Sequence, residues 1–184
     1  MRFLHHHPLY GASRTVRLLL AERNLVFLPK MENPWERHEE FLTLNPAGDV
    51  PVLVTEDGVV LSGTMVIAEF LEETEDEGTS LIWGSASERA EIRRLTHWFE
   101  QKFVREVGAP LLNERYIKRV AARGNPSSEV MRAAMTNLHI HLDYIDWLAE
   151  QGNWLAGKAM SLADLAAAAH LSVTDYFGLS LIHI

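Results

Sequence analysis

Cysteine is absent from this sequence of 184 residues. Its absence excludes disulfide bonds, thiolate metal sites and covalent catalysis through a protein thiol. No apolar run approaches the roughly 18 residues that a membrane-spanning helix needs, and Met1 does not begin a signal-peptide pattern. No repeat period is present either. We therefore expect a globular, cytoplasmic protein with no membrane partner.

Basic residues are scarce in the first part of the chain. Residues 1–80 hold 14 acidic and 6 basic side chains, whereas the remainder holds 11 of each. The net charge of −8 therefore lies entirely in the first part. Because an acidic surface repels phosphate backbones, we expect no nucleic-acid partner.

The most informative segment that is present, residues 45–54, reads Asn-Pro-Ala-Gly-Asp-Val-Pro-Val-Leu-Val. Pro51 has no N–H for a sheet ladder, so it belongs at the start of a strand, and the bond before it can be cis at low cost. A cis bond would turn the N–H and C=O of Val50 outward, where an extended, peptide-like ligand could pair with them. The Asp57-Gly58 pair that follows predicts a hairpin turn.

A change of composition divides the chain. Residues 72–80 are acidic, include a glycine and nearly lack apolar side chains, which is typical of a linker between domains. We predict a first domain over residues 1–75, a linker over 76–86 and a second, helical domain over 87–178.

Helical periodicity dominates the second domain. Apolar residues at helical spacing predict a helix over residues 87–107, which Pro110 kinks or stops. A break at residues 124–127 precedes a long second helix that ends at Gly152. The expected inner stripe of this second helix consists of Val130, Met131, Ala134, Leu138, His141, Leu142, Ile145 and Leu148.

Ser161 and Asp164 have the spacing of a helix capping box, with Met160 and Leu165 as its hydrophobic staple. A cap of this kind stabilises a helix by about 1 kcal/mol, so we interpret both polar residues as structural rather than catalytic. The alanine-rich helix that follows is expected in the centre of the domain.

In their order and spacing, these segments resemble the glutathione S-transferase (GST) superfamily. An opening strand over residues 2–6, a loop with Pro8, a helix over 13–23 and the segment 45–54 are similar to its amino-terminal domain. The capping box is similar to that of its carboxy-terminal domain. The resemblance implies an α/β plus all-α fold, in which a thioredoxin-like domain is followed by a GST-type helical domain that is incomplete at its end.

Residues 179–184 match nothing in the superfamily and look like a translated sequencing adaptor. We exclude them from the fold. We expect the natural protein to continue past Gly178 with roughly one or two further helices.

The resemblance places a hydroxyl donor for the glutathione thiolate near the start of the first helix. Aligned through Val16 and Arg17, the position of a catalytic serine is held by Tyr10, and Ser13 lies one turn inward. Either hydroxyl could be the catalytic donor, although Ser13 is also a candidate N-cap of the helix.

Four further positions correspond to the glutathione site: Val50, Pro51, Gly63 and Thr64. Many members of the superfamily have Glu-Ser where this chain has Gly63-Thr64. The threonine can still donate to a carboxylate at the helix N-terminus, but the glutamate is missing. Val50 and Pro51 are retained, yet this proline is also a structural element of the thioredoxin-like fold. No other cofactor is expected, and glutathione stays open as a ligand.

The consecutive histidines His5, His6 and His7 do not predict a metal site, since successive side chains of a strand point to opposite faces. The histidines on predicted helices show no paired ligand pattern and are interpreted as core or interface residues. We expect no bound metal.

Several segments carry a narrower resemblance: residues 6–10, residues 35–48, Gly63 with a hydroxyl residue after it, residues 98–99, 102–106, 141–145 and 153–157. They resemble the bacterial FtsZ-localised, GST-like cell-division proteins of the FzlA type. Such proteins are dimers that bind filaments of the tubulin-like protein FtsZ, change filament curvature and are thought to act without glutathione. The resemblance implies a homodimer that binds FtsZ filaments at the division site.

Trp35 is the candidate partner-binding residue. It lies between Pro34 and a charged run, where a loop does not need an aromatic side chain, and exposed aromatic residues are typical anchors of interfaces. It could instead pack on its own domain. Trp98, Phe99 and Phe103 are likewise assigned either to the core or to a dimer interface.

Three functions stay open at this point. The first is a non-catalytic adaptor of the division machinery that binds FtsZ filaments. The second is a glutathione transferase that uses Tyr10 or Ser13 to conjugate glutathione to small electrophiles. The third is a pseudo-transferase with an unknown partner.

Overall fold

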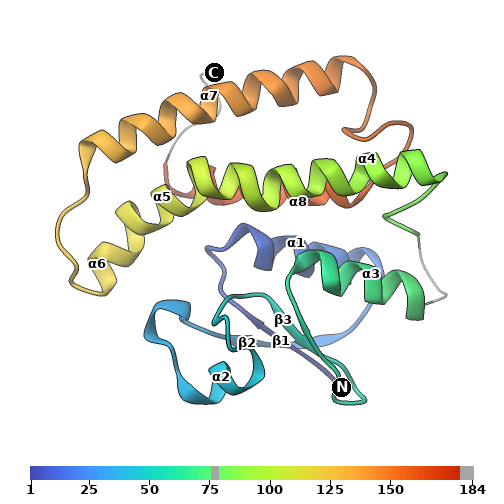
Figure 1. Cartoon of the computed structure of the whole chain (residues 1–184), viewed down its shortest axis with the longest axis horizontal. Helices are drawn as coiled ribbons and strands as arrows, with labels where there is room; N and C mark the ends of the chain where they lie inside the picture. Colours follow the sequence, from blue (N-terminus) through green and yellow to red (C-terminus); the bar gives the residue numbers. More distant parts are fainter. Residues whose placement is uncertain (76–78, 179–184) are drawn as a thin grey trace.

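The structure, a computed structural model, describes residues 1–75 and 79–178. Figure 1 shows a small sheet, helices α1 and α3 beside it, and a layer of long helices beyond them. Within the described ranges the sheet has four strands in the order β2-β1-β3-β4. β1 runs parallel to β2 and antiparallel to β3, and β3 pairs antiparallel with β4, as in a thioredoxin-like domain. The strands are β1 (Arg2–His6), β2 (Phe27–Met31), β3 (Val52–Val54) and β4 (Val60–Ser62).

The segment 45–54 folds as its residues predict. The Val50–Pro51 peptide bond is cis, and β3 follows it directly. Gly58 turns the chain from β3 into β4 with a φ of 83°, a value that favours glycine. The sequence pattern does not indicate β2, because Pro29 interrupts it. This strand forms at the edge of the sheet, which is the position that tolerates a proline.

Helix α1 (Gly11–Glu22) begins two residues earlier than predicted. Tyr10 is its N-cap residue and makes no side-chain cap. The prediction that Ser13 is an N-cap is therefore wrong: Ser13 lies inside the first turn, and its Oγ accepts a hydrogen bond of 3.3 Å from the His7 N–H. The other elements of this part are η1 (Pro34–Glu36), α2 (Glu39–Leu44) and α3 (Thr64–Thr74).

The rest of the described chain is helical. The first helical run continues past Pro110 and turns away from the axis of α4 in this region (Figure 1), so the proline does not stop it. η2 and η3 are π-helical, a wider coil than the α-helix. The elements are α4 (Ala86–His97), η2 (Trp98–Gly108), α5 (Ala109–Leu112), η3 (Asn113–Ile117), α6 (Lys118–Val120), α7 (Ser128–Glu150) and α8 (Leu162–Tyr176).

α8 forms the centre of the helical part, as its alanines predict. Ala163 and Ala166 are buried, and α8 packs along α1. The Asp164 carboxylate accepts a hydrogen bond of 2.8 Å from the Ser161 N–H, and the Ser161 hydroxyl donates to the same carboxylate. Asp164 also accepts from the Leu155 N–H, so the cap ties the preceding loop to the helix.

Packing in the helical part decides between core and interface for the aromatic residues of η2. Phe99 and Phe103 are fully buried against residues of α7 and α8, so they are core residues. Trp98 is partly buried and donates from Nε1 to Nδ1 of His141 at 3.1 Å. The inner stripe of α7 is shorter than predicted, because Val130 is exposed.

The acidic segment begins with helical residues. Glu72 belongs to α3 and accepts hydrogen bonds from buried Arg23, the C-cap residue of α1, and from the Leu81 N–H. The predicted linker 76–86 is described only in part and the segment 179–184 lies outside the described residues, so the domain boundaries stay predictions. In the part of the chain that is described, no helix is long and apolar enough to cross a membrane.

Candidate functional site

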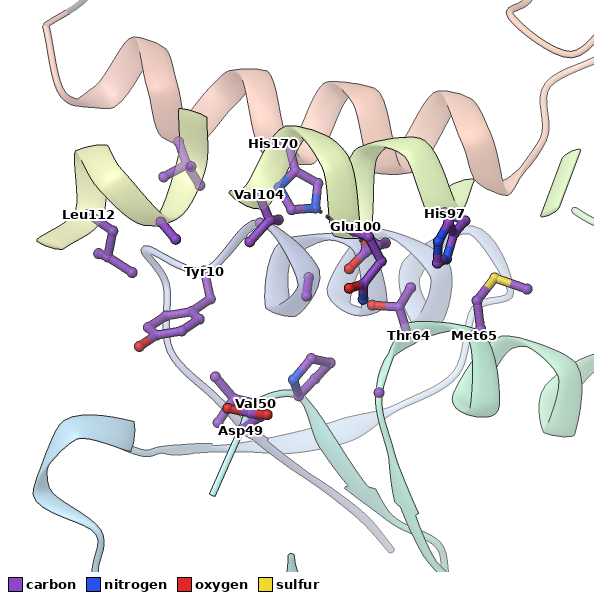
Figure 2. A pocket seen from close by; sticks show the side chains of 18 of the residues that line it. Tyr10, Asp49, Val50, Thr64, Met65, His97, Glu100, Val104, Leu112 and His170 are labelled. Atoms are coloured by element: carbon purple, nitrogen blue, oxygen red, sulfur yellow. Dashed lines mark ion pairs between the residues drawn. The ribbon is translucent and has the colours of Figure 1, made fainter. Parts of the chain in front are cut away.

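A cavity of about 550 Å³ opens between the thioredoxin-like part and the helical part. Figure 2 shows side chains that point into it from the loops beside β1 and β3, from α3, and from η2 and α8. The apolar lining includes Leu9, Val50, Met65, Val104, Leu112 and Val173. The polar lining includes Tyr10, Asp49, Thr64, Glu100, Gln101 and His170.

The cavity brings together five of the six residues that the sequence assigns to catalysis or to glutathione binding. Ser13 is the exception: it does not line the cavity and is completely buried, so its hydroxyl does not face a ligand there. The roles of the other five stay predictions. They are Tyr10, Val50, Pro51, Gly63 and Thr64.

Tyr10 keeps its proton at neutral pH. Burial, together with the charge of Asp49, raises the pKa of Tyr10 to about 12. The phenol can therefore donate a hydrogen bond, but it is a weaker acid than a free tyrosine. The Asp49 charge that helps to raise this pKa would also oppose a thiolate bound beside the phenol.

Thr64 begins α3 and brings the N-terminus of this helix to the cavity. Its side chain is 5% exposed, and its Oγ1 has no hydrogen-bond partner among the described residues. The first N–H groups of the helix also lack intrahelical partners and suit an electron-rich group. Gly63 has a φ of 90°, and a Cβ at this position would meet open space. No side chain therefore occupies the place of the missing glutamate.

Four titratable residues of the cavity were not predicted from the sequence: Asp49, His97, Glu100 and His170. Glu100 lies on η2, and its side chain is 10% exposed. Its Oε1 accepts a hydrogen bond of 3.0 Å from Thr15 Oγ1 and lies 3.4 Å from Nε2 of His170. The position of Asp49 directly before Val50 is a signal that could have found it. Glu100 and His170 reach the cavity through the packing of η2 and α8, which no local pattern indicates.

Trp35 joins the two parts of the molecule. In η1, its ring centroid lies 5.1 Å from that of His7 and 5.7 Å from that of Tyr116 in η3. The residue is half-buried, so it packs on its own chain and still presents part of its surface to solvent. Both interpretations of Trp35 are compatible with this position, and its role in binding a partner stays a prediction.

Buried histidines make the stability of the fold depend on pH. Burial, with a smaller contribution from the charge of His6, lowers the pKa of His7 from 6.5 to about 4. Burial also lowers the pKa values of His6 and His141. When folding lowers the pKa of a histidine, the unfolded state binds the proton more readily than the folded state. The fold is therefore most stable above the pKa of the unfolded state, and it loses stability as the pH falls toward the pKa of the folded state. We expect the free energy of unfolding to fall between pH 6.5 and 4, by on the order of 2 kcal/mol through His7 alone.

Urea unfolding between about pH 6.5 and 5 measures this effect, because most carboxylates stay ionised in that window. His7→Asn should flatten the dependence, since an Asn Oδ1 can replace Nδ1 as the acceptor of the Leu9 N–H without titrating. The same slope in the variant and the parent would show that His7 is not responsible.

The charges of the cavity limit its chemistry. Asp49 and Glu100 both line it, and none of the described lining residues is a lysine or an arginine. Two carboxylates therefore face the polar groups of the cavity. These groups are the N-terminus of α3 and the side chains of Tyr10, Ser62, Thr64, His97, Gln101 and His170. No three His, Cys, Asp or Glu residues in the described ranges are grouped so that they could hold a metal ion.

Comparison with known proteins agrees with this architecture. Residues 12–74 match the family model described as glutathione S-transferase, N-terminal domain. The chain is 48% identical to FtsZ-localized protein A of Caulobacter vibrioides over 180 residues. The aligned region covers 96% of this chain and 78% of that protein. The solved structure of FzlA from C. crescentus has a TM-score of 0.92 and 48% identity, over 98% of this chain and 80% of the other. A glutathione S-transferase from Rhodospirillum rubrum F11 has a TM-score of 0.94 and 47% identity, over 100% of this chain and 82% of the other. The chain therefore belongs to the glutathione S-transferase superfamily, in the family that contains FtsZ-localized protein A.

Proposed function

We propose that this chain is a GST-like cell-division protein that binds FtsZ filaments as a homodimer, without glutathione catalysis, and acts in the cytoplasm at the division site. The observation that carries the proposal is the 48% identity to FtsZ-localized protein A across 96% of the chain. The match extends over both parts of the fold, and not only over one shared motif.

The cavity supports the non-catalytic half of the proposal. Ser13 is buried away from it, Gly63 leaves the place of a supporting glutamate vacant, and Asp49 and Glu100 give it a negative charge. Glutathione would bring two carboxylates, one ammonium group and, in the reactive form, a thiolate, so its net charge is negative. Like charges in a cavity of low dielectric repel strongly, so this site favours neither binding nor thiolate formation.

The outer face of α3 supports the homodimer. Leu61, Met65, Val66 and Phe70 line a shallow groove there, and Val66 is 52% exposed. An apolar strip of this kind, bordered by glutamates, is typical of a surface that another protein covers.

Replacing Trp35 by alanine is expected to weaken FtsZ-filament binding by about 10-fold or more, because aromatic anchors dominate interface energies. Co-sedimentation with filaments at several protein concentrations measures the affinity. Trp147→Ala is the matched control, since Trp147 is 54% exposed on α7, far along the chain from η1. Thermal unfolding must accompany both variants, because Trp35 also packs on Tyr116. A folded Trp35→Ala variant that binds as the parent does would exclude Trp35 as an anchor.

A glutathione transferase is the alternative function. It is favoured by the convergence of Tyr10, Val50, Pro51 and Thr64 on one cavity. Conjugation of glutathione to 1-chloro-2,4-dinitrobenzene, compared between the parent and Tyr10→Phe, tests it. Turnover above the uncatalysed rate that disappears in Tyr10→Phe would establish the alternative and contradict the non-catalytic half of the proposal.

A further inference from the structure

Glu100 is a nearly buried carboxylate that no cationic Lys or Arg side chain approaches. Its side chain is 10% exposed at the cavity wall. Among the described residues its contacts are the Thr15 hydroxyl at 3.0 Å and His170 Nε2 at 3.4 Å, and both are made by Oε1. The His170 contact does not form a hydrogen bond, because Nε2 has no such partner in the described part of the chain. The Thr15 hydroxyl is therefore the one hydrogen-bond donor to this carboxylate among the described residues.

A second side chain of the same cavity has an unused acceptor. Thr64 is 5% exposed, and its Oγ1 is without a partner among the described residues. Figure 2 shows the Thr64 hydroxyl and the Glu100 carboxylate both directed into the cavity, from α3 and η2 respectively. Two buried oxygens from different elements are therefore left for a ligand. Because the N-terminus of α3 opposes a cation beside Thr64, the Glu100 carboxylate supplies the attraction and Thr64 only a hydrogen-bond acceptor.

Two cations on elements beside the cavity, Arg14 and Lys102, have other partners. Arg14 on α1 donates from Nε to the Pro8 carbonyl at 2.7 Å and from Nη1 to Ser172 Oγ at 2.7 Å, and it does not line the cavity. Lys102 on η2 pairs with Glu106 and does not line the cavity either. Within the described residues the cavity therefore holds two carboxylates and two histidines, His97 and His170, but no lysine or arginine.

We propose that the cavity binds a ligand that carries a primary ammonium or guanidinium group on an apolar stem, with the cation held by the Glu100 carboxylate and the Thr64 hydroxyl. Such a cation supplies several N–H donors and the missing positive charge. Leu9, Val104 and Leu112 provide an apolar wall for the stem. The ligand chemistry is the same for a free amine and for a lysine or arginine side chain of a partner, and the inference is independent of filament binding.

Calorimetric titration of the whole chain with a matched series of ligands tests the charge preference. The series is hexylamine, agmatine, 1-hexanol and hexanoate. Hexylamine is expected to bind about 10-fold or more tightly than 1-hexanol, and hexanoate more weakly than 1-hexanol. Equal binding of the amine and the alcohol, tighter binding of hexanoate, or a Kd above about 10 mM for every cation would overturn the proposal.

A further titration identifies the source of the cation. A capped tripeptide with a central lysine is compared with the same peptide carrying norleucine, and with hexylamine. Binding of the lysine peptide as tightly as hexylamine supports the proposal and assigns the group to a partner's side chain. Binding of the free amine alone supports it as well and assigns a small molecule.

Two variants locate the cation. Glu100→Gln keeps the shape of the side chain and is expected to lower hexylamine affinity by about 10- to 100-fold while leaving 1-hexanol unchanged. Thr64→Val should lower hexylamine affinity by about 3- to 10-fold. Glu91→Gln is the control, since Glu91 lies on α4 and pairs with exposed Arg94.

A structural role of Glu100 alone would move the affinities of amine and alcohol together, so an unchanged ratio of the two contradicts the proposal. If Glu100→Gln does not fold, Thr64→Val and the ligand series on the parent chain still test whether the cavity binds a cation.

Discussion

Glu72→Ala is expected to lower the free energy of unfolding by about 3–5 kcal/mol, the largest effect among single carboxylate replacements in this chain. Glu72 is an 11% exposed carboxylate that binds Arg23, itself 5% exposed. The carboxylate also accepts from the Leu81 N–H at 2.8 Å and from Ser80 Oγ at 2.7 Å. Its removal leaves a buried guanidinium unpaired and frees the segment that leads to α4.

Chemical denaturation of Glu72→Ala beside Glu91→Ala measures this effect. Glu91 pairs with Arg94 on the exposed side of α4, where an ion pair contributes about 1 kcal/mol or less. We expect a large loss of unfolding free energy for Glu72→Ala and a small loss for Glu91→Ala. Similar small losses for both would show that the buried pair does not hold α1, α3 and the following segment together.

Gly11→Ala is expected to destabilise the protein by about 2–3 kcal/mol, because the added methyl group overpacks the contact between α1 and α8. A Cβ on Gly11 would lie 2.0 Å from Nδ1 of His170, whose side chain is 3% exposed and has little room to move. Either the helices separate or the imidazole leaves its place beside Glu100. Thermal or urea unfolding measures the loss.

Gly108→Ala is the matched control for this substitution. Gly108 is also helical, but the nearest atom to an added Cβ is Val104 Cγ2 at 4.0 Å, an ordinary contact. Alanine there is expected to be neutral or to stabilise by up to about 1 kcal/mol, since glycine is a poor helix former. A Gly11→Ala variant as stable as Gly108→Ala would contradict the close packing of α1 on His170.

Local rules predicted the parts of the fold that depend on neighbours in the sequence. Pro51, the Asp57-Gly58 turn and the carboxylate half of the Asp164 cap each need only a few adjacent residues, and the structure has all three. The predicted start of α1 was wrong because the Ser13 hydroxyl accepts a hydrogen bond from the His7 N–H, in the chain before the helix. Local sequence cannot show that contact.

The site was predicted in part for the same reason. Val50, Pro51, Gly63 and Thr64 belong to two short segments beside the sheet, and resemblance to a known fold places them together. Glu100 meets this cavity only because η2 and α8 pack across α1, so its role depends on contacts between residues far apart in the chain.

Co-sedimentation of this chain with FtsZ filaments, assembled with GTP from the FtsZ of the same organism, tests the central claim most directly. The account predicts saturable pelleting that depends on filaments and is unaffected by added glutathione. A folded, dimeric protein that stays in the supernatant at every filament concentration would contradict it.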